Sequence, residues 1–178
     1  MLIRYATPAD ASAMARVKVD TWRSAYSGII DSDYLGSLSY AEVKERFRNS
    51  MDIPAPYERF MVVEDRGEVI GFAIFGRERA VASLERGEIY AIYVMPERQG
   101  EGVGRKLMAA AVSKLKEDGM RSLTVWTLER GKSRRFYERL GGHPCRTKNA
   151  CIGGKDYTHV AYCWPNLDTQ KNKKLNNK

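Results

Sequence analysis

The stretch EIYAIYVMPERQGEGVGRKLMAAAVSKL, residues Glu88 to Leu115, decides the fold of this chain. It opens with a strand over residues 88–94, whose apolar run from Ile89 to Val94 is typical of a central strand covered on both faces, and Pro96 ends it. A glycine-rich turn over residues 98–104 follows, and an amphipathic helix begins near Gly102. Glycines let the turn bring several N–H groups together, and the positive end of the helix dipole points at the same place. The stretch therefore predicts a site for phosphate groups.

Two common phosphate-binding motifs do not fit this turn. A Walker loop requires G-x-x-x-x-G-K-[ST], and the chain contains no such string. A dinucleotide fingerprint, G-x-G-x-x-G, would need a final glycine where the chain has Arg105 or Leu107. The turn matches Q-x-x-G-x-[GA] instead, from Gln99 to Gly104.

Length and composition are those of a globular domain. The 178 residues suffice for one domain with a substantial core, which we assign to residues 1–165. Residues 166–178, rich in Asn and Lys, are predicted to form a basic, disordered tail. No apolar run approaches the roughly 20 residues that span a bilayer, and the N-terminus lacks a signal-peptide core, so we expect a cytoplasmic location and no membrane partner.

The formal net charge of +8 is interpreted as a solvated basic surface that also attracts an anionic ligand. No nucleic-acid-reading motif is present, so a nucleic-acid partner is not favoured. The three cysteines, Cys145, Cys151 and Cys163, are odd in number and crowded, which argues against a disulfide framework and predicts free, partly buried thiols. His143 and His159 lie among them, but the spacings contain no C-x-x-C pair, so we expect no metal site.

Periodicity predicts the elements on either side of the central stretch. A strand at 2–5 precedes a helix that is capped by Thr7 and ends before Gly28. Further helices are expected at 32–38, 40–48, 102–118 and 131–140, and strands at 60–64, 69–75, 88–94, 122–128, 143–148 and 157–164. The strand, helix, strand succession from 88 to 128 predicts a parallel, right-handed crossover.

The turn motif resembles the acetyl-CoA signature of the GNAT superfamily of N-acyltransferases, and V-x-P at Val94 to Pro96 precedes it. A second segment, Phe136 to Gly141, resembles the family's F-Y-E-x-x-G sequence. Over roughly residues 1–165 the resemblance implies an α/β (α+β) GNAT fold. Its mixed, mostly antiparallel sheet of six to seven strands would be flanked by helices, with a V-shaped splay between the strands at 88–94 and 122–128. Exposed edge strands in such a fold would allow a homodimer.

The resemblance implies acetyl-CoA, or another short acyl-CoA, as the acyl donor. Strand residues would hold its pantetheine arm, and the turn and helix start would hold its pyrophosphate. The residues so implied are Ile92, Tyr93, Val94, Arg98, Gln99, Gly100, Glu101, Gly102, Val103, Gly104 and Arg105. Where the family often has a cofactor-contacting Asn, this chain has Arg130, which could reach a phosphate instead.

Tyr137 corresponds to the family's frequent general acid, which would protonate the departing CoA thiolate. A phenol, with a reference pKa of about 10, is protonated at neutral pH, and aromatic packing is the alternative role. Glu88 stands where some members keep a general-base glutamate; alternatively it is a solvated residue at a strand end. Trp22 and Tyr26 are either core residues or walls of the acceptor pocket.

The expected activity is acetyl transfer from acetyl-CoA to a primary amine of a small molecule, by direct attack in a ternary complex. A polyamine, an amino acid or an aminoglycoside-like compound would each serve as acceptor. A protein lysine or N-terminal acetyltransferase and a non-catalytic acyl-CoA-binding regulatory module are the alternatives. A cationic acceptor would favour an acidic pocket, which Glu88, Asp31, Asp33 and Glu42 could supply.

Overall fold

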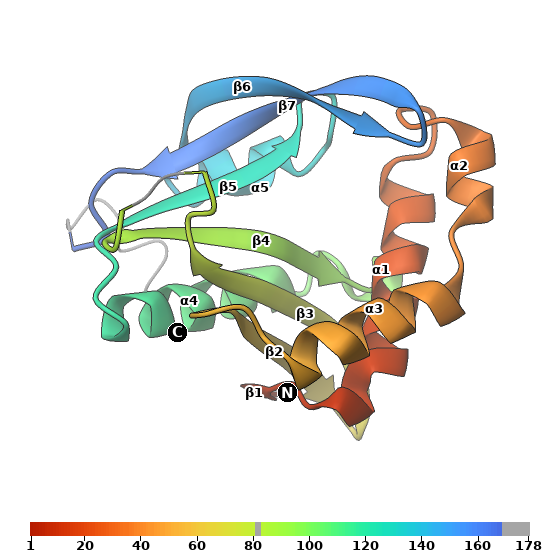
Figure 1. Cartoon of the computed structure of the whole chain (residues 1–178), viewed down its shortest axis with the longest axis horizontal. Coiled ribbons are helices and arrows are strands. Elements are labelled where there is room, and N and C mark those ends of the chain that lie inside the picture. Colours follow the sequence, from red (N-terminus) through yellow and green to blue (C-terminus); the bar gives the residue numbers. More distant parts are fainter. Residues whose placement is uncertain (81–82, 169–178) are drawn as a thin grey trace.

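The computed structural model of this chain describes residues 1–80 and 83–168. Its centre is a seven-stranded sheet of order β1-β2-β3-β4-β5-β7-β6 (Figure 1). The strands are β1 (Leu2–Tyr5), β2 (Arg59–Asp65), β3 (Glu68–Arg77), β4 (Arg86–Val94), β5 (Ser122–Leu128), β6 (His143–Ile152) and β7 (Lys155–Trp164). Only the β4–β5 pair is parallel. The predicted mixed, mostly antiparallel sheet is therefore confirmed.

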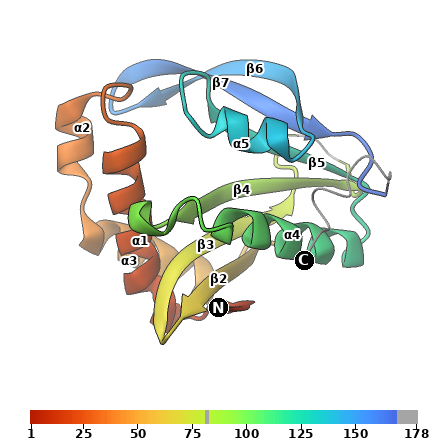
Figure 2. The same ribbon diagram turned by 180° about the vertical axis from the view of Figure 1, so that it is seen from behind.

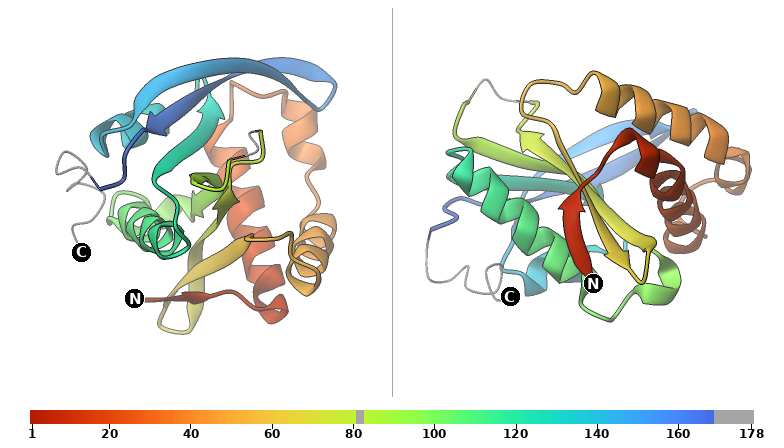
Figure 3. Two further views of the ribbon diagram at one scale, coloured as in Figure 1. Left: turned by 60° about the vertical axis from the view of Figure 1, so that its left-hand side comes forward. Right: turned by 90° about the horizontal axis from the view of Figure 1, so that it is seen from below.

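The helices cover both faces of the sheet. They are α1 (Ala11–Ala25), α2 (Ser32–Ser37), α3 (Tyr40–Asp52), α4 (Val103–Glu117) and α5 (Arg134–Arg139), with 3-10 turns η1 (Pro8–Asp10) and η2 (Pro96–Arg98). From behind, α4 and α5 lie in front of the sheet (Figure 2). From below, α4 lies on one side of β2 and β3 while α1 and α3 lie on the other (Figure 3, right).

Each face of the sheet has its own hydrophobic core. Leu107 and Leu115 of α4 pack with Ile89 on one face, and Met14 of α1 packs with Phe72 on the other. The pattern at the start of α1 differs slightly from the prediction, because Thr7 caps the 3-10 turn η1 and the α-helix begins only after it. These two cores hold β3 and β4 in place between them.

Strands β4 and β5 diverge after a short parallel ladder. Their pairing ends at Ile89 and Val125, although both strands continue (Figure 1). On the other edge of β4, Ile74 pairs with Ala91 and Phe75 with Ile89, so Tyr90 is an extra, bulged residue. A bulge bends a strand and increases its twist, which turns β4 away from β5. The predicted V-shaped splay is confirmed.

The splay corrects one expectation about β4. Residues 87–89 are buried, as a strand covered on both faces requires, but residues 90–93 are only half-buried. They are apolar because they line a cavity rather than because two layers cover them.

The β6–β7 hairpin is longer than predicted, and its tip reaches α2 (Figure 1). Its turn, Gly153 and Gly154, has left-handed backbone angles. A Cβ on Gly153 would lie 2.4 Å from the Tyr34 ring, so only glycine allows this approach. Lys155 Nζ lies 2.6 Å from Asp31 Oδ2, and the Tyr157 hydroxyl accepts a 3.0 Å hydrogen bond from the Asp31 N–H. The hairpin tip is thus tied to the segment between α1 and α2.

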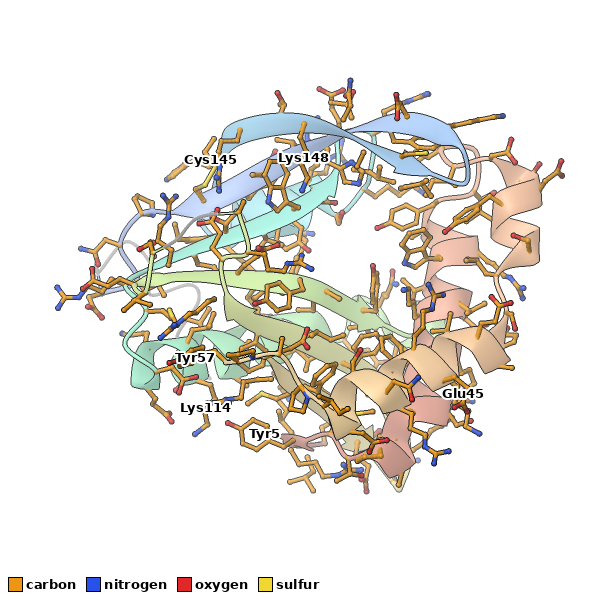
Figure 4. The ribbon with its side chains drawn as sticks, viewed as in Figure 1. Tyr5, Glu45, Tyr57, Lys114, Cys145 and Lys148 are labelled. Atoms are coloured by element: carbon orange, nitrogen blue, oxygen red, sulfur yellow. A yellow bond between two sulfur atoms is a disulfide. The ribbon has the colours of Figure 1, made fainter. Side chains whose placement is uncertain are left out.

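The prediction of free, partly buried thiols is wrong. Cys145 and Cys163 form a disulfide across the hairpin, with their Cα atoms 6.0 Å apart (Figure 4). The ladder between β6 and β7 shifts register between Pro144 and Arg146, which brings Cys145 beside Cys163 although the sequence spacing does not suggest it. Cys151 is free but exposed.

The chain packs against the body beyond residue 165. Leu167 is buried, and its N–H donates to the Arg121 carbonyl at 2.8 Å. Asp168 pairs with Lys116 at 2.8 Å. The predicted disordered tail therefore begins too early, and its remaining residues, 169–178, lie outside the described residues. Within the described ranges, no helix is long and apolar enough to cross a membrane.

Candidate active site

A cavity of about 720 Å³ opens where β4 and β5 diverge. It lies between the C-terminal half of α1, the glycine-rich turn and the helix α5. In an antiparallel pair, alternate residues of a strand direct their N–H and C=O groups away from the paired strand. Beyond Ile89, β4 pairs with β3 but no longer with β5, so its free edge presents such groups to this space. Of the residues implied as cofactor ligands, those that line it are Ile92, Tyr93, Val94, Gln99, Gly100, Gly102, Gly104 and Arg105.

The glycine-rich turn holds the start of α4 against the end of β4. Gly100 and Gly102 have φ angles of +85° and +81°, in the left-handed region that favours glycine. Gly102 is the N-cap of α4, so the free N–H groups of the first helical turn begin there. Gln99 Nε2 and Thr21 Oγ1 both donate to the Val94 carbonyl at 3.0 Å. These hydrogen bonds fix the turn and α1 against the end of β4.

Three exposed cations add charge to this end of the cavity. Arg105, Lys132 and Arg139 line it, and none of them forms an ion pair with another described residue. The sequence indicated Arg105 but missed the other two. The second motif could have indicated both residues, because Lys132 lies just before the segment Phe136 to Gly141 and Arg139 lies inside it.

Three predicted cofactor ligands, Arg98, Glu101 and Val103, do not line the cavity. Arg98 bonds to Asp65 at 2.9 Å and to Glu101 at 3.0 Å, so these charges brace the turn from outside. Val103 is buried in the core under α4. Arg130, which replaces the family's cofactor-contacting Asn, is exposed and is also absent from the lining. These residues therefore shape the site without lining it.

Tyr137 lies on the inner wall of the cavity. Its side chain comes from α5, packs edge-on against Phe136 with ring centroids 5.2 Å apart, and is 5% exposed. A 2.6 Å contact between the hydroxyls of Thr127 and Ser133 ties the start of α5 to β5. Burial raises the pKa of Tyr137 above its ordinary value, with Tyr93 as a second cause. The phenol therefore stays protonated and can donate, but cannot act as a base near neutral pH.

Two further phenols, those of Tyr26 and Tyr93, lie near Tyr137. Tyr26 lines the cavity, and burial raises its pKa, with Tyr93 and Tyr137 contributing. Trp22 does not line the cavity; its ring packs edge-on against Tyr26 with centroids 5.1 Å apart. Tyr93 also lines the cavity, and burial raises its pKa. Only Tyr26 of the predicted aromatic pair can touch a bound molecule directly.

Glu88 is buried but lies outside the cavity lining. It accepts hydrogen bonds from the Arg79 N–H at 3.0 Å and from Arg79 Nη2 at 2.8 Å. It lies close to Tyr90, a lining residue whose pKa is raised to about 12 by burial and by the charge of Glu88. The Glu88 carboxylate is therefore held by Arg79 and is not part of the cavity lining.

The acidic pocket expected for a cationic acceptor is not present. Glu88, Asp31, Asp33 and Glu42 are all absent from the lining, and no described lining residue is an Asp, a Glu or a His. Asp31 instead accepts from Lys155 and from two N–H groups at the start of α2, which lower its pKa. The carboxylates that the sequence suggested as pocket residues have structural partners or lie elsewhere.

The chain resembles N-acetyltransferases in both sequence and structure. The family model described as "Acetyltransferase (GNAT) family" matches residues 22–142. An uncharacterized N-acetyltransferase of Bacillus subtilis, YuaI, is 36% identical over 169 residues, which cover 95% of each chain. A GNAT-family acetyltransferase of Desulfovibrio desulfuricans superposes with a TM-score of 0.70 at 25% identity, covering 92% of this chain and 97% of that one. The structure of yncA from Salmonella typhimurium with acetyl-CoA superposes with a TM-score of 0.70 at 22% identity, covering 96% and 95% of the two chains.

Proposed function

This chain belongs to the GNAT family of acetyltransferases and is an acyl-CoA-dependent N-acyltransferase, and we propose that it acetylates the primary amine of a small molecule. The observation that carries the proposal is the single cavity between β4 and β5. It joins a cationic, glycine-lined end to a wall that holds a protonated phenol. One end suits the phosphates of acetyl-CoA and the other suits the reacting groups.

For the donor, we propose that the turn from Gln99 to Gly104 holds the pyrophosphate. Arg105, Lys132 and Arg139 lie where they can pair with phosphate oxygens, and the unpaired edge of β4 can bond to an amide-containing arm. When bound, acetyl-CoA supplies an activated thioester.

For the acid, we propose Tyr137. It lines the cavity, is protonated at any pH near neutrality, and can pass its proton to the departing thiolate. The backbone N–H groups on the free edge of β4 can stabilise the negative charge that develops on the thioester oxygen. The fold holds the Tyr137 hydroxyl and the N–H groups of β4 in place before a ligand binds. Electrostatic catalysis requires such preorganised groups.

For the proton that the amine must lose, we propose water as the first acceptor. No described lining residue is a carboxylate or a histidine, and the lining phenols Tyr26, Tyr90 and Tyr137 have raised pKa values that make them poor bases. Glu88, behind Tyr90, can receive this proton only through water. Its ion pair with Arg79 favours a structural role instead.

The acceptor side favours a small molecule over a protein side chain. The hairpin tip closes against α2 through Asp31, Lys155 and Gly153, next to the α1 residues that line the cavity. The backbone on either side of a protein lysine would have to pass the contact between the β6–β7 hairpin tip and α2. A homodimer and a cytoplasmic location remain predictions from the sequence.

Thiol release tests the proposed function. The purified chain is incubated with acetyl-CoA and a panel of small amines and lysine-containing peptides, and free thiol is measured with and without each amine. We expect amine-dependent release with at least one small amine. Calorimetric binding of acetyl-CoA without turnover of any amine would favour a non-catalytic binding module, and release with peptides alone would favour a protein acetyltransferase.

A further inference from the structure

We propose that the acceptor is an amine that also carries an anionic group, in the simplest case a carboxylate, and that Lys148 and Arg146 bind this group beside Trp126. This inference rests on the proposed function and names its substrate class. It reverses the sequence-based suggestion of an acidic pocket for a cationic acceptor.

Trp126 connects the cavity to the β6–β7 hairpin. It lines the cavity from β5, and its neighbour Val125 belongs to the core under α4. Successive side chains of a strand alternate between faces, so Trp126 points to the face of the sheet opposite α4. That is the face on which α1 and Tyr26 lie, away from the helix N-terminus that is proposed to hold the donor phosphates. A group bound beside Trp126 therefore belongs to the acceptor rather than to the donor.

Two cations of β6 lie over the Trp126 ring. Lys148 Nζ is 4.2 Å and the Arg146 guanidinium carbon is 5.5 Å from ring centroids of this indole. Figure 4 shows Lys148 on the inner side of the hairpin. Neither cation is itself in the cavity lining, but attraction between a cation and the ring face holds both charges against an indole that does line the cavity.

Among the described residues, the ion pairs and ring contacts that extend from this part of the sheet involve more cations than carboxylates. The carboxylates are Glu58, Glu78 and Glu88, and the cations are Arg77, Arg79, Arg86, Arg146 and Lys148.

Both buried carboxylates of this set already have arginine partners. Glu78 accepts from Arg146 and lies 3.0 Å from Arg86 Nε, and Glu88 pairs with Arg79. Lys148 forms no ion pair with any described residue, and its known neighbour is the indole ring. A positive charge held beside a lining residue, with no acid paired to it, attracts anions and repels cations.

A carboxylate next to the amine fits this arrangement. The anion would pair with Lys148, with Arg146 adding a second positive charge, while the amine points inward past Trp126 to Tyr26 and Tyr137. A polyamine would place a second ammonium group near Lys148, where it meets repulsion and finds no lining carboxylate. The charge of the face thus selects among the acceptor classes.

The test compares matched amines on the full chain. For each of several amino acids, kcat/KM is measured for the free acid, its carboxamide and its decarboxylated amine, with spermidine as a polyamine. We expect the free acid to exceed its decarboxylated partner by about tenfold or more, as one charge-assisted contact would give. Lys148→Met should reduce this preference about tenfold, mainly through KM. Acetyl-CoA affinity, measured by calorimetry, should not change.

Lys44→Met, at an exposed position of α3, removes an equal charge away from the cavity and should leave the preference intact. Equal or better turnover of decarboxylated amines and spermidine would overturn this inference while the proposed function stands. An unchanged preference of Lys148→Met for free acids over decarboxylated amines would also overturn this inference and leave the proposed function standing. No turnover of any amine, with acetyl-CoA still bound, would overturn the proposed function and this inference with it.

Discussion

Replacing Tyr137 with phenylalanine separates the catalytic role of this residue from its structural role. The ring is buried between Phe136 and Tyr162, and phenylalanine keeps these contacts. The hydroxyl forms no hydrogen bond with another described residue, so its loss leaves no protein partner unsatisfied. We therefore expect the free energy of unfolding to change by less than about 1 kcal/mol, or a few degrees in Tm at this chain length.

Turnover should respond very differently to the same change. Positioned general acids contribute about 10² to 10⁴ in rate, which corresponds to about 3 to 5 kcal/mol of barrier. We expect kcat to fall within this range, with acetyl-CoA affinity nearly unchanged. Because burial raises the pKa of this phenol, the native enzyme should show no alkaline loss of activity from Tyr137 up to about pH 10.

The assay is thiol release at saturating amine, together with thermal unfolding and calorimetric binding of acetyl-CoA. Tyr5→Phe is the matched control, because it removes an exposed phenol on β1 far from the cavity lining. Native turnover in Tyr137→Phe would refute the acid role and leave aromatic packing as the function of this residue. A large loss of stability would show instead that the hydroxyl has a structural partner.

Three further substitutions test other parts of the account. Glu88→Gln removes a buried charge held by Arg79, so unfolding free energy should fall by about 1 to 2 kcal/mol while the shape of the pH–rate profile stays the same; a selective loss of rate at low pH would instead identify Glu88 as the base. Gly102→Ala introduces no clash, since the nearest atom to its Cβ is Arg105 Nη2 at 4.0 Å, but its φ of +81° should cost about 1 kcal/mol and weaken acetyl-CoA binding measured by calorimetry. Hydrogen bonds from the Arg4 side chain and from the Thr7 N–H lower the pKa of Asp10 to about 2. The ionised Asp10 therefore contributes its full stabilisation of the folded state above about pH 4, and this contribution is lost as the pH falls toward 2. Asp10→Asn should remove this dependence from acid unfolding curves and cost up to about 2 kcal/mol near neutral pH, because solvent screens part of the pair.

The parts of the site that were predictable are those encoded locally. The turn from Gln99 to Gly104 has its conformation set by glycines and by the helix that follows, so the sequence pattern alone indicates a phosphate site. Tyr137 reaches the cavity because a short motif places it on α5, one residue from Phe136. Such features depend on neighbours in the chain, and composition and spacing can therefore reveal them.

The parts that were not predictable depend on pairing between distant segments. The bulge at Tyr90 depends on the register against β3, and neither the position of Glu88 behind Tyr90 nor its arginine partner follows from spacing. The shifted register of the β6–β7 hairpin likewise brings Cys145 to Cys163. Lys148 of β6 likewise contacts the Trp126 ring of β5 only when the sheet is assembled.

We propose that acetyl-CoA lies in the cavity where β4 and β5 diverge. A crystal structure of the chain with CoA would show whether it does. We expect the pyrophosphate against the N–H groups of the turn from Gln99 to Gly104 and the start of α4, the pantetheine arm along the free edge of β4, and the sulfur near the Tyr137 hydroxyl. CoA bound outside this cavity, or in it with the sulfur away from Tyr137, would contradict the account.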